Sequence, residues 1–198
     1  MTLHRILFAT SNRGKVADVR SFVGGERYAI LSPEQIVGRG EPPAVEEGIS
    51  SYRENAALKA VAYLGWSGLP SIGDDTGLEV EALGGAPGII SARYAGVGAS
   101  PRENTEKLLA LLSGESNRRA LFRAVVVLVT PAGGRYEAEG ILHGAIVREP
   151  RGGGGFGYDN VFEVEGTGQT LAELKEAGSG VVTHRHRALR ALFEQLDR

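Results

Sequence analysis

The stretch LFRAVVVLVTPAGGRYEAEGILHGAIV, residues 121–147, contains the two strongest strand patterns in the chain. Residues 121–130 and 136–147 are rich in aliphatic and β-branched side chains, and residues 131–134 between them have the composition of a turn. Two strands joined by so short a turn pair with each other in antiparallel orientation. We therefore expect a long hairpin, which excludes a purely parallel sheet.

Upstream of this hairpin, the chain opens with a strand, a turn and a helix. Residues 5–9 have the apolar pattern of a buried strand, and residues 15–23 have the period of an amphipathic helix. The expected buried face of this helix consists of Val16, Val19, Phe22 and Val23. A strand that leads through a short turn into a helix is typical of the α/β class.

The remaining elements are a mixture of strands and helices. Further strands are expected at residues 28–31, 70–73, 78–82 and 160–164, and further helices at residues 51–64, 101–112 and 184–196. Ser100 and Thr183 are the expected N-caps of the last two helices. No repeat or linker divides the sequence. We expect an α/β fold with one mixed central sheet, helices on both sides, and a single domain of residues 1–198.

The spacing of apolar residues predicts which helix faces are buried. In residues 51–64, Ala57, Val61 and Leu64 lie at i, i+4 and i+7 and form the expected core face. Asn55 and Lys59 then lie on the opposite side. In residues 184–196, the expected buried stripe consists of Leu189, Leu192, Phe193 and Leu196.

The composition is that of an ordinary soluble globular protein. Of 198 residues, 42% are hydrophobic and 23% are charged, and the formal net charge is -2. Because there is neither a basic excess nor a basic stripe, nucleic acid is not an expected partner. The longest strongly apolar run, residues 124–129, is far too short to span a membrane. The lack of cysteine and of a signal-peptide pattern favours a cytoplasmic location.

The turn TSNRGK, residues 10–15, places two cations and a glycine at the start of the first helix. It resembles half of a Walker phosphate loop, but Ala9 stands where that loop has its first glycine, and Val16 follows the lysine. Unpaired backbone N–H groups and the positive end of the helix dipole still favour an anion at this point. The stretch by itself leaves two interpretations open, a phosphate-binding turn and an ordinary solvated turn.

Two acidic pairs are candidates for metal binding. Asp74 and Asp75 lie in GDDTGL at an expected strand end, where neighbouring side chains point to opposite sides. One of them is expected to bind metal or water while the other supports it, and a solvated or capping role is the alternative. Glu46 and Glu47 lie in an expected loop, where acidic pairs are common, and are weaker candidates.

The glycine-rich run GGGGFG, residues 152–157, has the spacing of a dinucleotide-binding fingerprint but not its context. That motif follows a strand and opens a helix, whereas Pro150 precedes this run and a strand-like pattern follows it. We expect a flexible loop that presents Phe156 and Asp159. An aromatic ring next to a carboxylate could stack on a base and accept a hydrogen bond from its edge, whereas a core role is the default for Phe156 taken alone. HRHR, residues 184–187, is interpreted as a basic, exposed helix end.

The order of these segments is more informative than any one of them. The series TSNRGK, ENAALKA, GDDTGLEVEALGGAPGIISARYAG, GGFGYD and THR resembles the noncanonical purine nucleoside triphosphate pyrophosphatases, also called inosine/xanthosine triphosphatases. The resemblance covers residues 8–185. It implies a mixed α/β fold with two lobes around a nucleotide-binding cleft, and a homodimer. It also implies Mg²⁺-dependent hydrolysis of ITP, dITP and XTP to the monophosphate and pyrophosphate.

The resemblance also implies roles for residues of this chain. Asp75 is the expected proton acceptor and a metal ligand, with Glu46 as a second metal ligand and Asp74 beside them. The residues expected to bind the nucleoside triphosphate are Thr10, Ser11, Asn12, Arg13, Gly14, Lys15, Lys59, Thr76, Phe156, Gly157, Tyr158, Asp159, Ser179, His184 and Arg185. Donors that meet a 6-keto group would be left unpaired by the 6-amino group of adenine, so selection against ATP is expected.

Two positions depart from the family pattern. The family has a lysine four residues before its Ser-His-Arg motif; here that position is Ser179, and Lys175 is a candidate to compensate. The segment EEGISSYRENA lacks one residue of the usual spacing, which leaves Glu47 as an alternative to Glu46. Two other functions stay open: a pyrophosphatase of pyrimidine or other modified nucleotides, and a nucleotide-binding module without catalysis.

Overall fold

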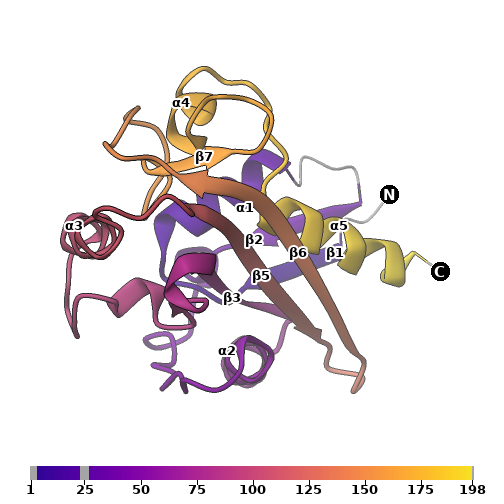
Figure 1. Ribbon diagram of the computed structural model, residues 1–198. Helices are drawn as coiled ribbons and strands as arrows, with labels where there is room; N and C mark the ends of the chain where they lie inside the picture. Colours follow the sequence, from indigo (N-terminus) through magenta and orange to yellow (C-terminus); the bar gives the residue numbers. More distant parts are fainter. Residues whose placement is uncertain (1–3, 23–26, 198) are drawn as a thin grey trace. The chain divides into compact units, whose positions relative to one another are not determined.

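The computed structural model describes residues 4–22 and 27–197, which form a mixed sheet and helices (Figure 1). The strands are β1 (His4–Phe8), β2 (Tyr28–Leu31), β3 (Ser71–Val80), β4 (Pro87–Gly88), β5 (Arg119–Val129), β6 (Arg135–Ile146) and β7 (Phe162–Val164). The α-helices are α1 (Arg13–Phe22), α2 (Tyr52–Ser67), α3 (Pro101–Leu111), α4 (Leu171–Glu176) and α5 (His184–Leu196). No helix in these residues is long and apolar enough to cross a membrane.

The strand order in the sheet is β2-β1-β3-β5-β6-β7, and β4 pairs with β3. β1 is parallel to both β2 and β3, whereas β4 is antiparallel to β3 and β7 is antiparallel to β6. β5 and β6 lie side by side as the long hairpin in Figure 1, and at its turn the Thr130 N–H donates to the Gly134 carbonyl at 2.9 Å. The predicted α/β class and mixed sheet are confirmed.

The chain divides into two compact units. Unit 1 comprises Met1–Asp75, Ala124–Gly140 and Arg185–Arg198, and unit 2 comprises Thr76–Arg123 and Ile141–His184. Strands β3, β5 and β6 contribute residues to both units. The single domain and the cleft between two lobes stay predictions.

In unit 1, the alternation of side chains along β5 brings helices to both faces of the sheet. Ala124, Val126 and Leu128 belong to one buried cluster, and Val127 and Val129 belong to another. The first cluster also contains Ile6, Phe8, Val16, Val19, Ile72, Ala188, Leu189 and Leu192, which come from β1, α1, β3 and α5. The second cluster also contains two alanines of α2, Ala56 and Ala60. Helices on both sides of the sheet are therefore a property of unit 1.

The predicted buried faces of α1 and α5 agree with the structure. Four residues were predicted for the buried stripe of α5. Leu189 and Leu192 are fully buried, and Phe193 and Leu196 are partly buried. Val16 and Val19 of α1 are buried as predicted. The predicted burial of Phe22 and Val23 is not tested, because the Phe22 side chain and all of Val23 lie outside what the structure describes. The helical period was sufficient here because large aliphatic side chains form these faces.

Unit 2 has its own core, to which α3 and α4 contribute. Ser100 accepts a hydrogen bond from the Glu103 N–H, so its predicted role as the N-cap of α3 is confirmed. Helix α4 is absent from the predicted elements because its six residues carry too little periodic pattern. Its N-cap Thr170 and Glu173 form a capping box, and this Thr-x-x-Glu signal was readable in the sequence.

The prediction of two short strands on either side of residues 74–77 is wrong. β3 runs without a break from Ser71 to Val80. Asp74 and Asp75 therefore lie in the middle of a strand, and they are only 2% and 4% exposed. The sequence DDTG has the composition of a turn, but each carboxylate has cationic or amide partners in unit 1. These partners allow a buried strand to contain two adjacent acids.

The predicted buried face of α2 is wrong in part. Val61 is 57% exposed, and Ala57 and Leu64 are only partly buried. Asn55 and Lys59, which the pattern places on the solvated side, are 1% and 8% exposed. The helix is rotated about its axis relative to the prediction, and it turns both polar side chains inward.

Close packing of small residues explains this rotation. A Cβ atom added to Gly73 of β3 would lie 1.9 Å from the Ala56 carbonyl oxygen and 2.8 Å from the Ala60 nitrogen. Helix α2 therefore meets β3 backbone to backbone, through two alanines and a glycine. A pattern search that weighs large apolar side chains does not detect such a contact.

Candidate active site

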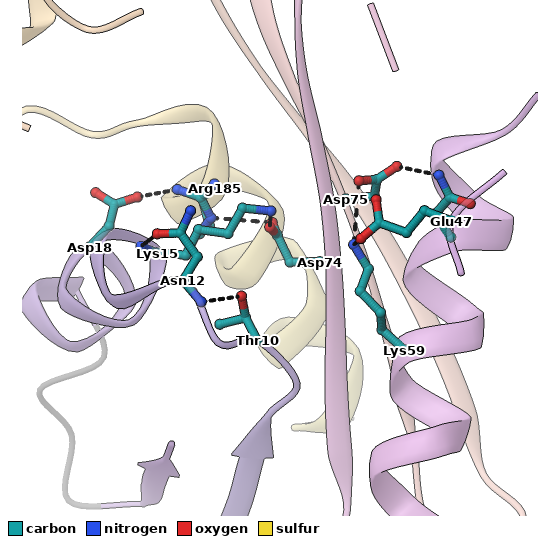
Figure 2. Close-up of polar contacts among 10 residues, drawn as sticks. Thr10, Asn12, Lys15, Asp18, Glu47, Lys59, Asp74, Asp75 and Arg185 are labelled. Carbon is teal, nitrogen blue, oxygen red and sulfur yellow. Dashed lines mark hydrogen bonds and ion pairs between the residues drawn. The ribbon is translucent and has the colours of Figure 1, made fainter. Parts of the chain in front are cut away.

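The turn from β1 to α1, residues 10–15, is ordered by its own side chains. The Asn12 N–H donates to Thr10 Oγ1 at 3.1 Å, and Asn12 Oδ1 accepts from the Lys15 N–H at 3.1 Å (Figure 2). Asn12 thereby caps the first turn of α1, which begins at Arg13. Ser11 and Arg13 are exposed. The turn thus combines a helix N-terminus with nearby cations, which is a favourable environment for an anion.

On one side of β3, Asp74 is bound by two cations. Lys15 Nζ forms an ion pair with Asp74 Oδ2, and Arg185 Nε lies 3.2 Å from Asp74 Oδ1 (Figure 2). The Arg185 side chain is 1% exposed and also forms an ion pair with Asp18 of α1. His186 Nε2 lies 3.4 Å from Asp18 Oδ1. A buried network of charges therefore joins α1, β3 and α5.

The groups of this network shift one another's pKa values. Burial by itself would raise the pKa of Asp74, but Arg185 and Lys15 outweigh it and hold this pKa well below its ordinary value. Burial lowers the pKa of Lys15, and Asp74 opposes this only in part. Burial would also lower the pKa of Arg185, but Asp74 and Asp18 raise it. Asp74 is therefore an ionised carboxylate whose oxygens already have cationic partners.

On the other side of β3, Asp75 faces α2 and the acidic loop. Lys59 Nζ lies 3.4 Å from Asp75 Oδ1 and 3.1 Å from Glu47 Oε1. Asn55 Nδ2 donates to Asp75 Oδ2 at 3.0 Å. Figure 2 shows Asp74 and Asp75 on opposite sides of the strand, as predicted from the alternation of side chains. Burial raises the pKa of Asp75, and Lys59 and Asn55 oppose this rise only in part.

Of the two glutamates, Glu47 reaches this side of β3. Its carboxylate contacts Lys59 and contributes to the raised pKa of Asp75. Glu46 is exposed and makes no side-chain hydrogen bond or ion pair with any described residue. The geometry therefore favours Glu47 over Glu46 as a neighbour of Asp75.

The donor set beside Asp75 fits Mg²⁺ bound together with a phosphate ligand. Within residues 4–22 and 27–197, no group of three or more Asp, Glu or His side chains is arranged to hold a metal ion. Mg²⁺ does not require such a group, because it is commonly held by one or two carboxylates with phosphate oxygens and water. Asp75 and Glu47 meet this requirement, whereas Asp74 is already paired with two cations.

In unit 2, the segment Phe156 to Asp159 is held by the Asp159 carboxylate. Asp159 is 4% exposed, and its Oδ2 accepts from the Phe156 N–H at 2.9 Å and from Lys175 Nζ at 2.9 Å. Lys175 Nζ also lies 5.2 Å from the centroid of the Phe156 ring. Tyr158 is buried and its hydroxyl donates to the Ser91 carbonyl at 2.9 Å. The segment is therefore anchored at three residues, while Phe156 is half-buried.

The glycine-rich run before this segment packs tightly against α4. A Cβ atom on Gly152 would lie 2.6 Å from the Glu173 nitrogen, and one on Gly154 would lie 2.6 Å from the Ala172 carbonyl oxygen. Glycine is needed at both positions so that the loop backbone can approach the helix. Two glycines of the run therefore pack against α4, and the flexibility expected of this loop stays a prediction.

The start of α5 is not the exposed basic end that the sequence predicts. His184, Arg185 and His186 are 4%, 1% and 6% exposed, and Arg187 is exposed. In unit 2, the His184 ring stacks on Phe122 with centroids 4.8 Å apart. In unit 1, Arg185 and His186 meet the acids described above. The prediction is wrong because partners in the tertiary structure let these basic side chains be buried.

The predicted site residues therefore form one group in each unit. Unit 1 brings together Thr10, Asn12, Lys15, Lys59, Asp74, Asp75 and Arg185, with Ser11, Arg13 and Gly14 in the same turn. Unit 2 contains Thr76, Phe156, Gly157, Tyr158, Asp159, Ser179 and His184. Of these, Thr76 is half-buried in β3 and Ser179 is exposed.

Two residues of the unit 1 group were not predicted. Asn55 contacts Asp75, and Asp18 contacts Arg185. Asn55 precedes Lys59 by one helical turn, so both side chains had to share one face, and this spacing was the available signal. Asp18 gave no comparable signal, because its partner Arg185 is distant in the sequence.

Comparisons with known proteins agree on one family. The model of the Ham1 family matches residues 6–195. A dITP/XTP pyrophosphatase of Geobacter sulfurreducens is 42% identical over 194 residues, which cover 97% of this chain and 96% of the relative. A dITP/XTP pyrophosphatase of Methylococcus capsulatus is 44% identical over 196 residues, with 97% and 96% coverage. The structure of a HAM1 protein from Coxiella burnetii superposes with a TM-score of 0.83 at 34% identity, covering 99% of both chains.

Proposed function

Because the chain belongs to the Ham1 family, we propose that it hydrolyses ITP, dITP and XTP to the monophosphate and pyrophosphate with the help of Mg²⁺. Family membership makes it an enzyme, a hydrolase that acts on nucleoside triphosphates. The proposed bases follow the names of the relatives, which are dITP/XTP pyrophosphatases, and the resemblance of the base-binding segments. Hydrolysis of such triphosphates would cleanse the nucleotide pool of deaminated purines.

The observation that carries this proposal is the arrangement around Asp75. A buried carboxylate of β3 has Lys59 on one oxygen and Asn55 on the other, with Glu47 beside the same lysine. We assign Asp75 as the acceptor of a proton from the attacking water. A carboxylate whose pKa is raised by burial is a better proton acceptor near neutral pH than an ordinary aspartate.

Asp75 and Glu47 are the residues that would hold Mg²⁺, with Glu46 as the alternative to Glu47. Bound there with substrate, the ion would neutralise phosphate charge and lower the pKa of a water molecule. Lys59 lies between the two carboxylates, and its long stem allows the ammonium group to turn toward phosphate oxygens. Asp74 would support the site indirectly, since it holds Lys15.

The triphosphate would be bound by the turn of residues 10–15. Backbone N–H groups at the start of α1, the exposed Arg13 and the ammonium group of Lys15 supply positive charge there. The Lys15 side chain is already held by Asp74, so little conformational entropy is lost when it meets an anion. Fixed cations of this kind stabilise the charge that develops on a leaving pyrophosphate.

The base would be recognised by residues of unit 2. The half-buried Phe156 ring is suited to stacking, and Asp159 fixes the backbone of the same segment. Ser179 replaces a lysine of the family pattern and so carries no positive charge. Lys175 can supply that charge, because its ammonium group lies 2.9 Å from Asp159 of the same segment. Ser179 and His184 stay proposed contacts.

The decisive experiment separates products by phosphorus NMR. The protein is incubated with Mg²⁺ and ITP, XTP, dITP, ATP or GTP in parallel. We expect pyrophosphate and monophosphate from the first three and little product from ATP or GTP. Release of orthophosphate would sink the proposed reaction, and a preference for ATP would sink the proposed selectivity.

Assembly and location stay proposals of the same kind. The resemblance supports a homodimer, which analytical ultracentrifugation can test against the 20.9 kDa mass of one chain. The sequence supports a cytoplasmic location.

Omission of Mg²⁺ with excess chelator is expected to abolish turnover, and undiminished turnover would remove the metal from the proposal.

A further inference from the structure

Two segments of the chain share the pattern Ser-x-x-Glu-Asn at the start of a helix. In SYREN, Ser51 caps α2 through the Glu54 N–H, and in SPREN, Ser100 caps α3 through the Glu103 N–H. Each pattern places an asparagine at the fourth helical residue. Alanine would favour the helix more at this position, so each asparagine needs a reason in the tertiary structure.

Both asparagines bind the backbone of the loop that precedes their helix. Asn55 Oδ1 accepts from the Gly48 N–H at 2.8 Å, and Asn55 Nδ2 donates to the Gly48 carbonyl at 3.2 Å. Asn104 Oδ1 accepts from the Ala95 N–H at 2.7 Å, and Asn104 Nδ2 donates to the Ala92 carbonyl at 3.1 Å. They are 1% and 4% exposed. Each asparagine therefore links the first turn of its helix to the preceding loop.

Only the first of the two asparagines also contacts a carboxylate. Asn55 Nδ2 donates to Asp75 Oδ2 at 3.0 Å, so its two N–H groups serve Gly48 and Asp75. This fixes the amide orientation, because the flipped amide would set its oxygen against two acceptors. One side chain therefore connects the backbone next to Glu47 with the carboxylate of Asp75.

We propose that Asn55 is a positioning residue that sets the geometry between Asp75 and the loop carrying Glu47. Its hydrogen bond occupies Asp75 Oδ2 and leaves Oδ1 on the side of Lys59 and Glu47. Its two bonds to Gly48 hold the peptide adjacent to Glu47. This role rests on the proposed function, in which the carboxylates of Asp75 and Glu47 bind one Mg²⁺ and must therefore be held close together.

The test compares Asn55→Ala with Asn104→Ala. Both variants lose a buried bridge from helix to loop, so both are expected to unfold at lower temperature than the wild type. Mn²⁺, observed by electron paramagnetic resonance with inorganic pyrophosphate as the phosphate ligand and compared with Mn²⁺ and pyrophosphate alone, reports the metal site without turnover. We expect Asn55→Ala to weaken Mn²⁺ binding and to lower kcat, each by about tenfold or more. We expect Asn104→Ala to leave both within about twofold of the wild type.

A second variant addresses the case in which Asn55→Ala does not fold. Asn55→Leu keeps nearly the same shape, favours the helix and buries no additional charge beside Asp75. It loses the donor to Asp75, so kcat is expected to fall by about tenfold or more. Either Asn55 variant with kcat within twofold of the wild type overturns the proposal.

The outcomes also separate this proposal from the proposed function. If the wild type releases no pyrophosphate from any nucleotide, the proposed function fails, while Mn²⁺ binding still decides the role of Asn55. Wild-type protein that does not bind Mn²⁺, or Asn55→Ala that binds it as tightly as Asn104→Ala does, overturns the positioning role. Loss of thermal stability alone would leave Asn55 with the structural role that Asn104 has.

Discussion

Asp74 and Asp75 are neighbours in β3 and are almost equally buried, at 2% and 4% exposure, yet their surroundings differ. Asp74 lies against Lys15 and Arg185, which keep it ionised. Asp75 has Lys59, an amide and a nearby glutamate, and burial raises its pKa. The first arrangement stabilises a charge; the second leaves a carboxylate able to accept a proton. Alternation along a strand is enough to separate an acid that anchors two cations from the acid that we propose to be reactive.

The largest expected effect is on the reactive side. Asp75→Asn removes the proposed proton acceptor and metal ligand, so kcat should fall by about 10²- to 10⁴-fold. Binding of ITP, measured by calorimetry, should persist because the turn of residues 10–15 is unchanged. Thermal stability should be equal or higher, since a buried carboxylate with a raised pKa is replaced by a neutral amide. Near-normal turnover would show that Asp75 has been assigned wrongly.

The anchoring side should respond in the opposite way. Asp74→Asn leaves Lys15 and Arg185 buried without their shared anion, and removing one member of a buried ion pair typically destabilises by about 3 to 5 kcal/mol. Urea denaturation at neutral pH measures this loss directly. Its matched control is Asp75→Asn in the same assay. If the two variants are equally stable, the contrast between the two sides of β3 is lost.

A smaller effect is expected from the backbone contact that brings α2 to Asp75. Gly73→Ala introduces a Cβ atom 1.9 Å from the Ala56 carbonyl oxygen, which should destabilise by about 1 to 3 kcal/mol. It should also lower kcat, since α2 carries Asn55 and Lys59. Gly65→Ala is the control, because a Cβ atom there meets nothing within 4 Å and alanine favours a helix. A Gly73→Ala protein as stable as Gly65→Ala contradicts the close contact.

The smallest expected effect is the pH dependence of the anchoring acid. The pKa of Asp74 is lowered from an ordinary value of 3.8, so its ionised form stabilises the folded state fully above that value. The contribution is lost as pH falls from there toward the lower, folded-state pKa. The difference in unfolding free energy between wild type and Asp74→Asn should therefore be constant from pH 7 to about pH 5 and shrink below about pH 4. If the difference in unfolding free energy grows as pH falls, the ionised form of Asp74 does not stabilise the folded state.

Much of the fold could be predicted from the sequence because it rests on local patterns. The hairpin of β5 and β6 followed from two β-rich runs and a short turn. The N-cap of α3 and the buried stripe of α5 followed from standard spacing. The face of α2 could not be predicted in this way. Its packing uses Ala56, Ala60 and Gly73, whose small size permits close approach but gives no periodic signal.

The sequence predicted which segments form the candidate site, but not which side chains contact one another there. The turn of residues 10–15 and the acids of β3 were found from their composition and order. The partners that distinguish Asp74 from Asp75 were not predicted. They are Arg185, 111 positions away from Asp74, and Asn55 and Lys59, which were expected on the solvated side of α2. No local rule connects residues so far apart in the chain.

The sequence by itself determined the mixed α/β class, the N-cap of α3, the buried faces of α1 and α5, and the family resemblance, because each depends on neighbouring residues or on the order of segments. The tertiary structure decided that DDTG is part of a continuous strand and that Lys59 and Arg185 are buried. It also decided that Asn55 connects a loop to Asp75. The physical reason is the same in each case. A buried polar group is stable only when partners reach it, and those partners come from distant parts of the chain.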